Sequence, residues 1–247
     1  LGLDALECSV TSDLAGRLTV SVTIARTRFT EEEVTGLTGE VSRICRRDLD
    51  IPEITHCRTV TMLSFGERPV FRAEFGAAGR PAKGQTVSGD ALEQFCDTSG
   101  RAQMLLCDGV ALGLKSAEQE SGATLDLLTI DLYTGRAGLF KAGAAPSFLV
   151  RDGVPRMLEG ASLPMGVLDS LVGRSTTFGL DAGDWVVLVS DGALTDGSQW
   201  LMEQLQLCAK LGHTPQQAAQ TIADAAVRRS GEKQDDITVA VVRLAQP

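Results

Sequence analysis

The chain has 247 residues, of which 43% are hydrophobic and 22% are charged, so it can bury a substantial core and disorder is not expected. Its formal net charge of −9 disfavours general nucleic-acid binding, because an acidic surface repels phosphate backbones. No run approaches the ~20 apolar residues of a membrane helix, and two histidines leave histidine-based metal or nucleophile chemistry almost no residues to use.

The first segment of the chain is expected to begin with a strand and a helix. Residues 17–26 alternate strictly between apolar and polar side chains, as in a half-buried strand. Thr30 and Glu33 have the spacing of a capping box at a helix start. The apolar residues of this helix share one face: Val34, Leu37, Val41, Ile44 and Cys45. We expect that face to pack on the segment's own sheet, with a homodimer interface as the alternative.

Two more strands are expected before the composition of the sequence changes. They cover residues 55–63 and 69–77, and the turn at Gly66-Glu67 joins them. The order β-α-β-β describes a small α+β unit, which we place at residues 1–78. It contains no polar constellation typical of a site, so we interpret it as a supporting or regulatory layer.

Residues 79–247 are rich in glycine and in Asp-Gly pairs, which separate short apolar strands. Two helices are expected, at residues 198–211 and at 214–229, the second with Pro215 in its first turn. The expected strands cover residues 104–107, 125–132, 137–142, 147–151, 174–180, 185–190 and 237–244. The pattern predicts an α+β fold in which two sheets pack together with helices on the outside.

Three acidic positions adjoin strands that read as fully buried. Asp108 and Asp191 directly follow apolar runs, and Asp235-Asp236 directly precedes another. A carboxylate at the end of a buried strand is costly unless a partner compensates it. Hard cations such as Mg²⁺ or Mn²⁺ prefer oxygen ligands of this kind. Spacing alone leaves two readings open, a metal site and structural turns. For the hairpin-like Asp152-Gly153 we adopt the turn.

Four short motifs, in this order, resemble the metal motifs of the type 2C (PPM) protein phosphatases: Val87–Asp90, Leu106–Gly109, Val189–Gly192 and Asp235–Thr238. Three other segments resemble the branch of that family containing the bacterial sporulation stage II protein E: Thr124–Leu128, Gly143–Phe148 and Leu163–Leu168. The β-α-β-β unit is similar to the end of the cytoplasmic regulatory region in that branch. The resemblance therefore covers nearly the whole chain.

The resemblance implies a β-sandwich of two antiparallel sheets flanked by helices. It also implies a dinuclear centre of two divalent cations, Mn²⁺ or Mg²⁺, at one end of this sandwich. Asp108 would bridge the two metals, and the Gly109 carbonyl would bind one of them. Asp191 and Asp235 would hold the other metal. Asp90 would orient a metal-bound water or ligate weakly.

The resemblance also implies a serine/threonine protein phosphatase in which a metal-activated water attacks the phosphorus. The substrate would be a phosphorylated protein similar to a phosphoserine anti-anti-sigma factor. The chain would be a cytoplasmic fragment, without a membrane segment, of a parent anchored in the membrane.

One departure from the family concerns the segment after Asp108. The family continues there with a pair of helices, for which the residues from Val110 to Ser121 leave no room. We expect that Val110 and Ala111, or a nearby pair, are not covalent neighbours. The departure keeps a catalytically silent regulatory module open as the alternative to an active phosphatase. A two-metal nuclease is the third reading, and the net charge of −9 opposes it.

Overall fold

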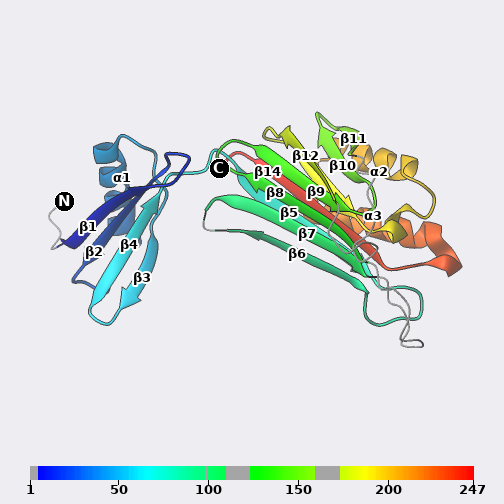
Figure 1. Ribbon diagram of the computed structural model, residues 1–247, viewed down its shortest axis with the longest axis horizontal. Helices are drawn as coiled ribbons and strands as arrows, with labels where there is room; N and C mark the ends of the chain where they lie inside the picture. Colours follow the sequence, from blue (N-terminus) through cyan, green and yellow to red (C-terminus); the bar gives the residue numbers. More distant parts are fainter. Residues whose placement is uncertain (1–4, 98, 110–122, 159–172) are drawn as a thin grey trace. The chain divides into compact units, whose positions relative to one another are not determined.

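The computed structural model describes residues 5–97, 99–109, 123–158 and 173–247. The chain divides into two compact units, Leu1–Pro69 and Val70–Pro247 (Figure 1). None of the helices in these described ranges has the length and apolar character needed to cross a bilayer. The predictions about Val110–Ala111 and about Leu163–Leu168 concern residues outside the described ranges.

The first unit is a four-stranded antiparallel sheet with one helix packed on it (Figure 1). Its strands run in the spatial order β1-β2-β4-β3. The predicted capping box is confirmed, because Thr30 accepts a hydrogen bond from the Glu33 amide and Glu33 accepts one from the Thr30 amide. The elements are β1 (Ala5–Ser12), β2 (Leu18–Ile24), α1 (Glu31–Cys45), β3 (Glu53–Cys57) and β4 (Val60–Gly66).

Two details of this unit differ from the sequence prediction. The strand expected at residues 55–63 is a hairpin, because the chain reverses at Arg58, whose φ of 53° lies in the left-handed region. Strand β1 was not expected, although it pairs with β2 over its whole length.

The second unit contains two five-stranded antiparallel sheets, β11-β10-β13-β14-β5 and β12-β9-β8-β7-β6. Its strands are β5 (Arg72–Arg80), β6 (Asp90–Cys96), β7 (Arg101–Gly109), β8 (Ala123–Asp131), β9 (Arg136–Ala142), β10 (Ser147–Arg151), β11 (Val154–Leu158), β12 (Arg174–Gly179), β13 (Trp185–Val189) and β14 (Ile237–Ala245). Its helices are α2 (Gln199–Lys210) and α3 (Pro215–Ser230), with short 3₁₀ turns η1 (Asp191–Leu194) and η2 (Gly231–Lys233).

Two apolar layers hold this unit together. Between the sheets, Leu106 and Leu128 of one sheet pack with Leu188 of the other. On the opposite face of the β13 sheet, Val187 packs with α2 and α3 residues such as Ile222. Figure 1 shows these two helices beside that sheet. The alternation along β13 therefore supplies both layers, and the predicted sandwich flanked by helices is confirmed.

The boundary between the units lies earlier than the predicted position between residues 78 and 79. Strand β5 pairs with β14 from Arg72 opposite Ala245 to Arg80 opposite Ile237, so it completes the second unit's sheet. It also lies close against the start of α3, because a Cβ at Gly76 would overlap the backbone of Pro215. The choice of partner strand is a tertiary property that local alternation does not specify. The supporting or regulatory role of the first unit stays a prediction.

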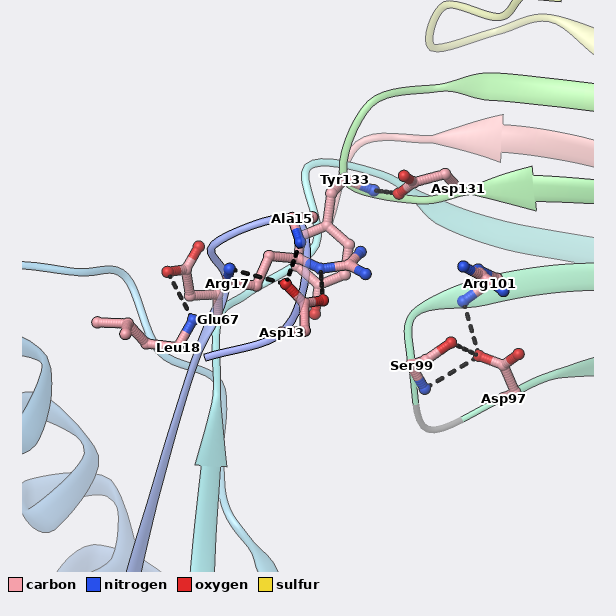
Figure 2. A network of polar contacts seen from close by, with 10 residues as sticks. All are labelled: Asp13, Ala15, Arg17, Leu18, Glu67, Asp97, Ser99, Arg101, Asp131 and Tyr133. Atoms are coloured by element: carbon pink, nitrogen blue, oxygen red, sulfur yellow. Dashed lines mark hydrogen bonds and ion pairs between the residues drawn. The ribbon is translucent and has the colours of Figure 1, made fainter. Parts of the chain in front are cut away.

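Several aspartates close turns, and Figure 2 shows three of them. Asp13 accepts from the Ala15 and Arg17 amides in the β1–β2 turn, and Asp131 accepts from the Tyr133 amide after β8. In the β6–β7 turn, one Asp97 carboxylate oxygen accepts from the Ser99 and Arg101 amides, each at 3.0 Å. The predicted Asp152-Gly153 turn is confirmed, since both residues have positive φ between β10 and β11.

Candidate metal centre

The candidate ligands Asp90 and Asp108 come from one hairpin. Asp90 begins β6, Asp108 is the penultimate residue of β7, and the two are direct partners in the antiparallel register. Directly opposite residues point to the same face of a sheet. For this pair the face is the one that carries Leu106 into the layer between the sheets.

The second pair of candidates lies at the end of the opposite sheet. Asp191 begins η1 just after β13, and Asp235 precedes β14. The Ser190 amide donates to the Thr238 carbonyl at 3.0 Å, which ties the two segments together. A Cβ at Gly192 would overlap the Asp236 carbonyl, so only a glycine allows Asp191 to lie this close to the Asp235 segment.

The raised pKa of Asp108 indicates that the other three candidate carboxylates lie near it. Burial and then the negative charges of Asp191 and Asp90 raise the pKa of Asp108 to about 7. The Asp191 carboxyl lies within hydrogen-bonding reach, and the charge of Asp235 adds a smaller contribution in the same direction. Repulsion among four carboxylates in a partly buried place can be relieved by uptake of a proton, as the raised pKa of Asp108 indicates, or by a bound cation.

Asp90 provides the test of whether this place suits a cation. Both of its carboxylate oxygens are buried and have no hydrogen-bond partner. Burial raises the pKa of Asp90, and the charges of Asp236 and Asp191 add to this rise. The Thr238 and Ser190 hydroxyls lie near enough to act in the opposite direction, although neither is in hydrogen-bonding geometry with the Asp90 oxygens. Buried acceptors without partners are rare, because the desolvation goes uncompensated. A hard cation would satisfy these oxygens, so the donor set fits Mg²⁺ or Mn²⁺.

Asp236 has a different task from its neighbour Asp235. Its two oxygens accept from the Ala82 amide at 2.8 Å and from the Gly89 amide at 2.9 Å. These bonds anchor the loop that leads into β6 and set the position of Asp90. Sequence analysis grouped Asp235 and Asp236 as one acidic position, and the resemblance assigned a metal-binding role to Asp235 and none to Asp236.

The candidate ligands do not form a closed cage. Within the described ranges, no group of three or more His, Cys, Asp or Glu side chains is arranged to hold a metal ion. The Gly109 carbonyl oxygen does lie at the same place, 3.3 Å from where a Cβ on Gly89 would stand. The roles predicted for Asp90, Asp108, Asp191 and Asp235, and for this carbonyl, therefore stay predictions.

Comparison with known proteins identifies the family. The model of the family "Stage II sporulation protein E (SpoIIE)" matches residues 91–245. This chain belongs to the SpoIIE family. The stage II sporulation protein E of Bacillus subtilis (strain 168) is 26% identical over 229 residues, which cover 76% of this chain and 28% of that protein. The Priestia megaterium protein is 23% identical over 222 residues, covering 74% and 38%. The chain therefore spans only about a third of these relatives.

Solved structures support the same fold. The PP2C phosphatase domain of Bacillus subtilis SpoIIE with a fragment of its regulatory domain aligns with a TM-score of 0.68 at 22% identity, covering 100% of this chain and 85% of that one. The serine/threonine phosphatase of S. agalactiae aligns with a TM-score of 0.58 at 16% identity, covering 70% and 99%. The predicted resemblance to the SpoIIE branch of the PPM phosphatases is confirmed at the level of family and fold.

Proposed function

We propose that this chain is a metal-dependent serine/threonine protein phosphatase domain. The observation that carries the proposal is the convergence of Asp90, Asp108, Asp191 and Asp235 at one end of a PP2C-like sandwich. Membership of the SpoIIE family supports it.

Two divalent cations, Mn²⁺ or Mg²⁺, would be held by Asp108, the Gly109 carbonyl, Asp191 and Asp235, with Asp90 beside them. Such ions lower the pKa of water and offset the charge that develops on a reacting phosphoryl group. The protein holds the carboxylates at fixed strand ends, and Asp236 anchors the loop before Asp90. The Ser190 hydroxyl accepts a hydrogen bond from the Thr238 amide at 2.8 Å, which fixes the two segments that lie next to Asp90.

The substrate we propose is a phosphoserine protein similar to an anti-anti-sigma factor, as the resemblance to the SpoIIE branch implies. We also propose that the domain acts on the cytoplasmic side of a membrane-anchored parent. Its coverage of only 28% and 38% of the two relatives supports a larger parent. The homodimer stays a prediction.

The test is Mn²⁺-dependent release of phosphate from a phosphoserine protein. Asp191→Asn keeps the shape of the side chain and removes its charge, so we expect a loss of at least about 100-fold in kcat. Asp152→Asn is the matched control, because Asp152 lies in the β10–β11 turn and asparagine tolerates its positive φ of 51°. Equal activities of the parent chain and Asp191→Asn would refute the proposal.

A catalytically silent regulatory module is the second candidate. The observation that favours it is that the described side chains form no ready-made metal cage. A silent module predicts binding of Mn²⁺ or of a phosphoprotein without turnover at any metal concentration. Turnover that saturates with Mn²⁺ would exclude this reading.

A further inference from the structure

A network of three polar side chains is buried inside the second unit. Lys141 donates hydrogen bonds to Asp126 and, at 2.7 Å, to the Ser147 hydroxyl, which lies 3.5 Å from the second Asp126 oxygen. The exposed fractions are 2% for Lys141 and 0% for the other two. These groups are therefore hydrogen-bonded to one another away from solvent.

The strand register places this network next to the candidate ligands, two residues further along the strands. Asp126 pairs with Leu106, which lies two residues before Asp108 on β7, and Lys141 pairs with Asp126. Residues two apart on a strand share a face and lie about 7 Å apart. Asp126 and Lys141 therefore point into the same layer between the sheets as Asp108 does.

Ser147 reaches the network from the opposite sheet. It begins β10, where the next residue, Phe148, packs with the helices while Leu149 packs between the sheets. The same alternation turns Ser147 toward the layer between the sheets. Phe148 pairs with Val187 on β13, the strand that leads directly to Asp191. The network thus joins the sheet of Asp108 to the strands that carry Asp191.

The energetics of the network make a purely stabilising role a weak explanation. Burial raises the pKa of Asp126 and lowers the pKa of Lys141, and the charge of each partner opposes the shift. Well-packed apolar residues can often replace a buried ion pair without loss of stability, whereas removal of one partner is strongly destabilising. Directional hydrogen bonds do, however, fix distances that apolar contacts leave adjustable.

We propose that Asp126, Lys141 and Ser147 are positioning residues for the candidate metal centre, whose network fixes the separation of the two sheets beneath it and so holds Asp108 against Asp191. The inference rests on the proposed function, because it concerns the same carboxylates. None of the three residues touches a metal or the substrate in this role.

The decisive variant is the double substitution Asp126→Leu with Lys141→Met, which removes both charges and keeps similar volumes. We expect a folded protein with a Tm near that of the parent chain. Its affinity for Mn²⁺ should fall about 10-fold or more, as when groups that orient metal ligands are lost. We expect kcat on a phosphoserine protein to fall with it, and KM for that protein to stay nearly constant.

A matched control lies where β10 ends and β13 begins. There Arg151 binds the buried Asp184, with its Nε 2.9 Å from the carboxylate. The double variant Arg151→Met with Asp184→Leu removes a charged pair that also joins two elements of the β13 sheet. We expect it to lower the Tm and to leave the affinity for Mn²⁺ unchanged.

Hydrogen exchange without metal separates this inference from the proposed function. Faster exchange at residues 106–109 and 189–192 in the Asp126/Lys141 variant, and not in the control, would support the inference even if the parent chain releases no phosphate. Exchange and Mn²⁺ affinity like those of the parent chain would overturn it even if the parent chain is an active phosphatase. If the double variant does not fold, Ser147→Ala, which keeps the ion pair, carries the same comparison.

Discussion

The two ends of the β6–β7 hairpin use aspartates in opposite ways. At the closed end, Asp97 accepts hydrogen bonds from Ser99 and Arg101 (Figure 2). It also accepts one from the Gln103 side chain. At the open end, Asp90 has two buried oxygens without a hydrogen-bond partner, and its neighbour Asp108 faces other carboxylates. At the closed end the carboxylate is hydrogen-bonded within the hairpin, whereas at the open end the Asp90 oxygens are buried without a hydrogen-bond partner.

The titration of these groups follows the same division. Burial acts to raise the pKa of Asp97, but the hydrogen bonds from Ser99, Arg101 and Gln103 outweigh it and the pKa is lowered. At Asp108, burial and negative neighbours act together and raise the pKa to about 7. Perturbed carboxylates without partners are typical of functional sites, and satisfied ones are typical of structure.

The largest effect that this comparison predicts is on catalysis by Asp108→Asn. The substitution removes one negative charge from the carboxylate cluster and keeps the side-chain shape. We expect a loss of about 10²–10³-fold in kcat, as for the loss of one charge-stabilising group. Unfolding by urea in the absence of metal should show equal or higher stability, because repulsion is relieved. Asp97→Asn is the control, with parent-like kcat, and a large loss of stability in Asp108→Asn would contradict the assignment.

A smaller effect is expected at the closed end of the hairpin. Asp97→Ala removes the acceptor of the Ser99 and Arg101 amides. We expect the free energy of unfolding to fall by about 1–2 kcal/mol, since these bonds are near the surface. The kcat of the folded enzyme should not change, and urea denaturation with a parallel activity assay measures both. A variant as stable as the parent chain would show that the turn does not depend on this carboxylate.

Local signals predicted the elements whose chemistry is local. The Thr30–Glu33 capping box and the Asp152-Gly153 turn depend only on neighbouring residues. Strand β6 was missed because it lies at the edge of its sheet and has no buried residue, so its sequence shows little apolar pattern. Strand β1 does alternate at Leu6, Cys8 and Val10, a signal that could have been read.

The acidic motifs identified candidate ligands whose charges act on Asp108, but they did not show how these carboxylates are supported. The anchoring role of Asp236 depends on amides at Ala82 and Gly89, far away in sequence. The network of Asp126 and Lys141 left a readable trace, since each charge stands at an inward position of an apolar strand. Only the register shows that the two are direct partners.

A pair of opposite pH dependences of stability is also expected in the metal-free protein. The pKa of Asp108 is raised from 3.8 to about 7, so the folded state binds the proton more tightly than the unfolded state does. Its contribution to stability is present below about pH 4 and is lost as the pH rises toward 7. The pKa of Asp97 is lowered, so its contribution is present above about pH 4 and is lost as the pH falls through the folded pKa.

Urea denaturation between pH 3 and pH 8 with a chelator present measures both. In Asp108→Asn, the free energy of unfolding should decline less steeply between about pH 4 and pH 7. In Asp97→Asn, only the loss of stability at acid pH should become smaller. If Asp108→Asn left the decline in the free energy of unfolding toward about pH 7 unchanged, Asp108 would be an ordinary ionised carboxylate. The contrast between the two ends of the hairpin would then fail, because both ends would hold their charge without help.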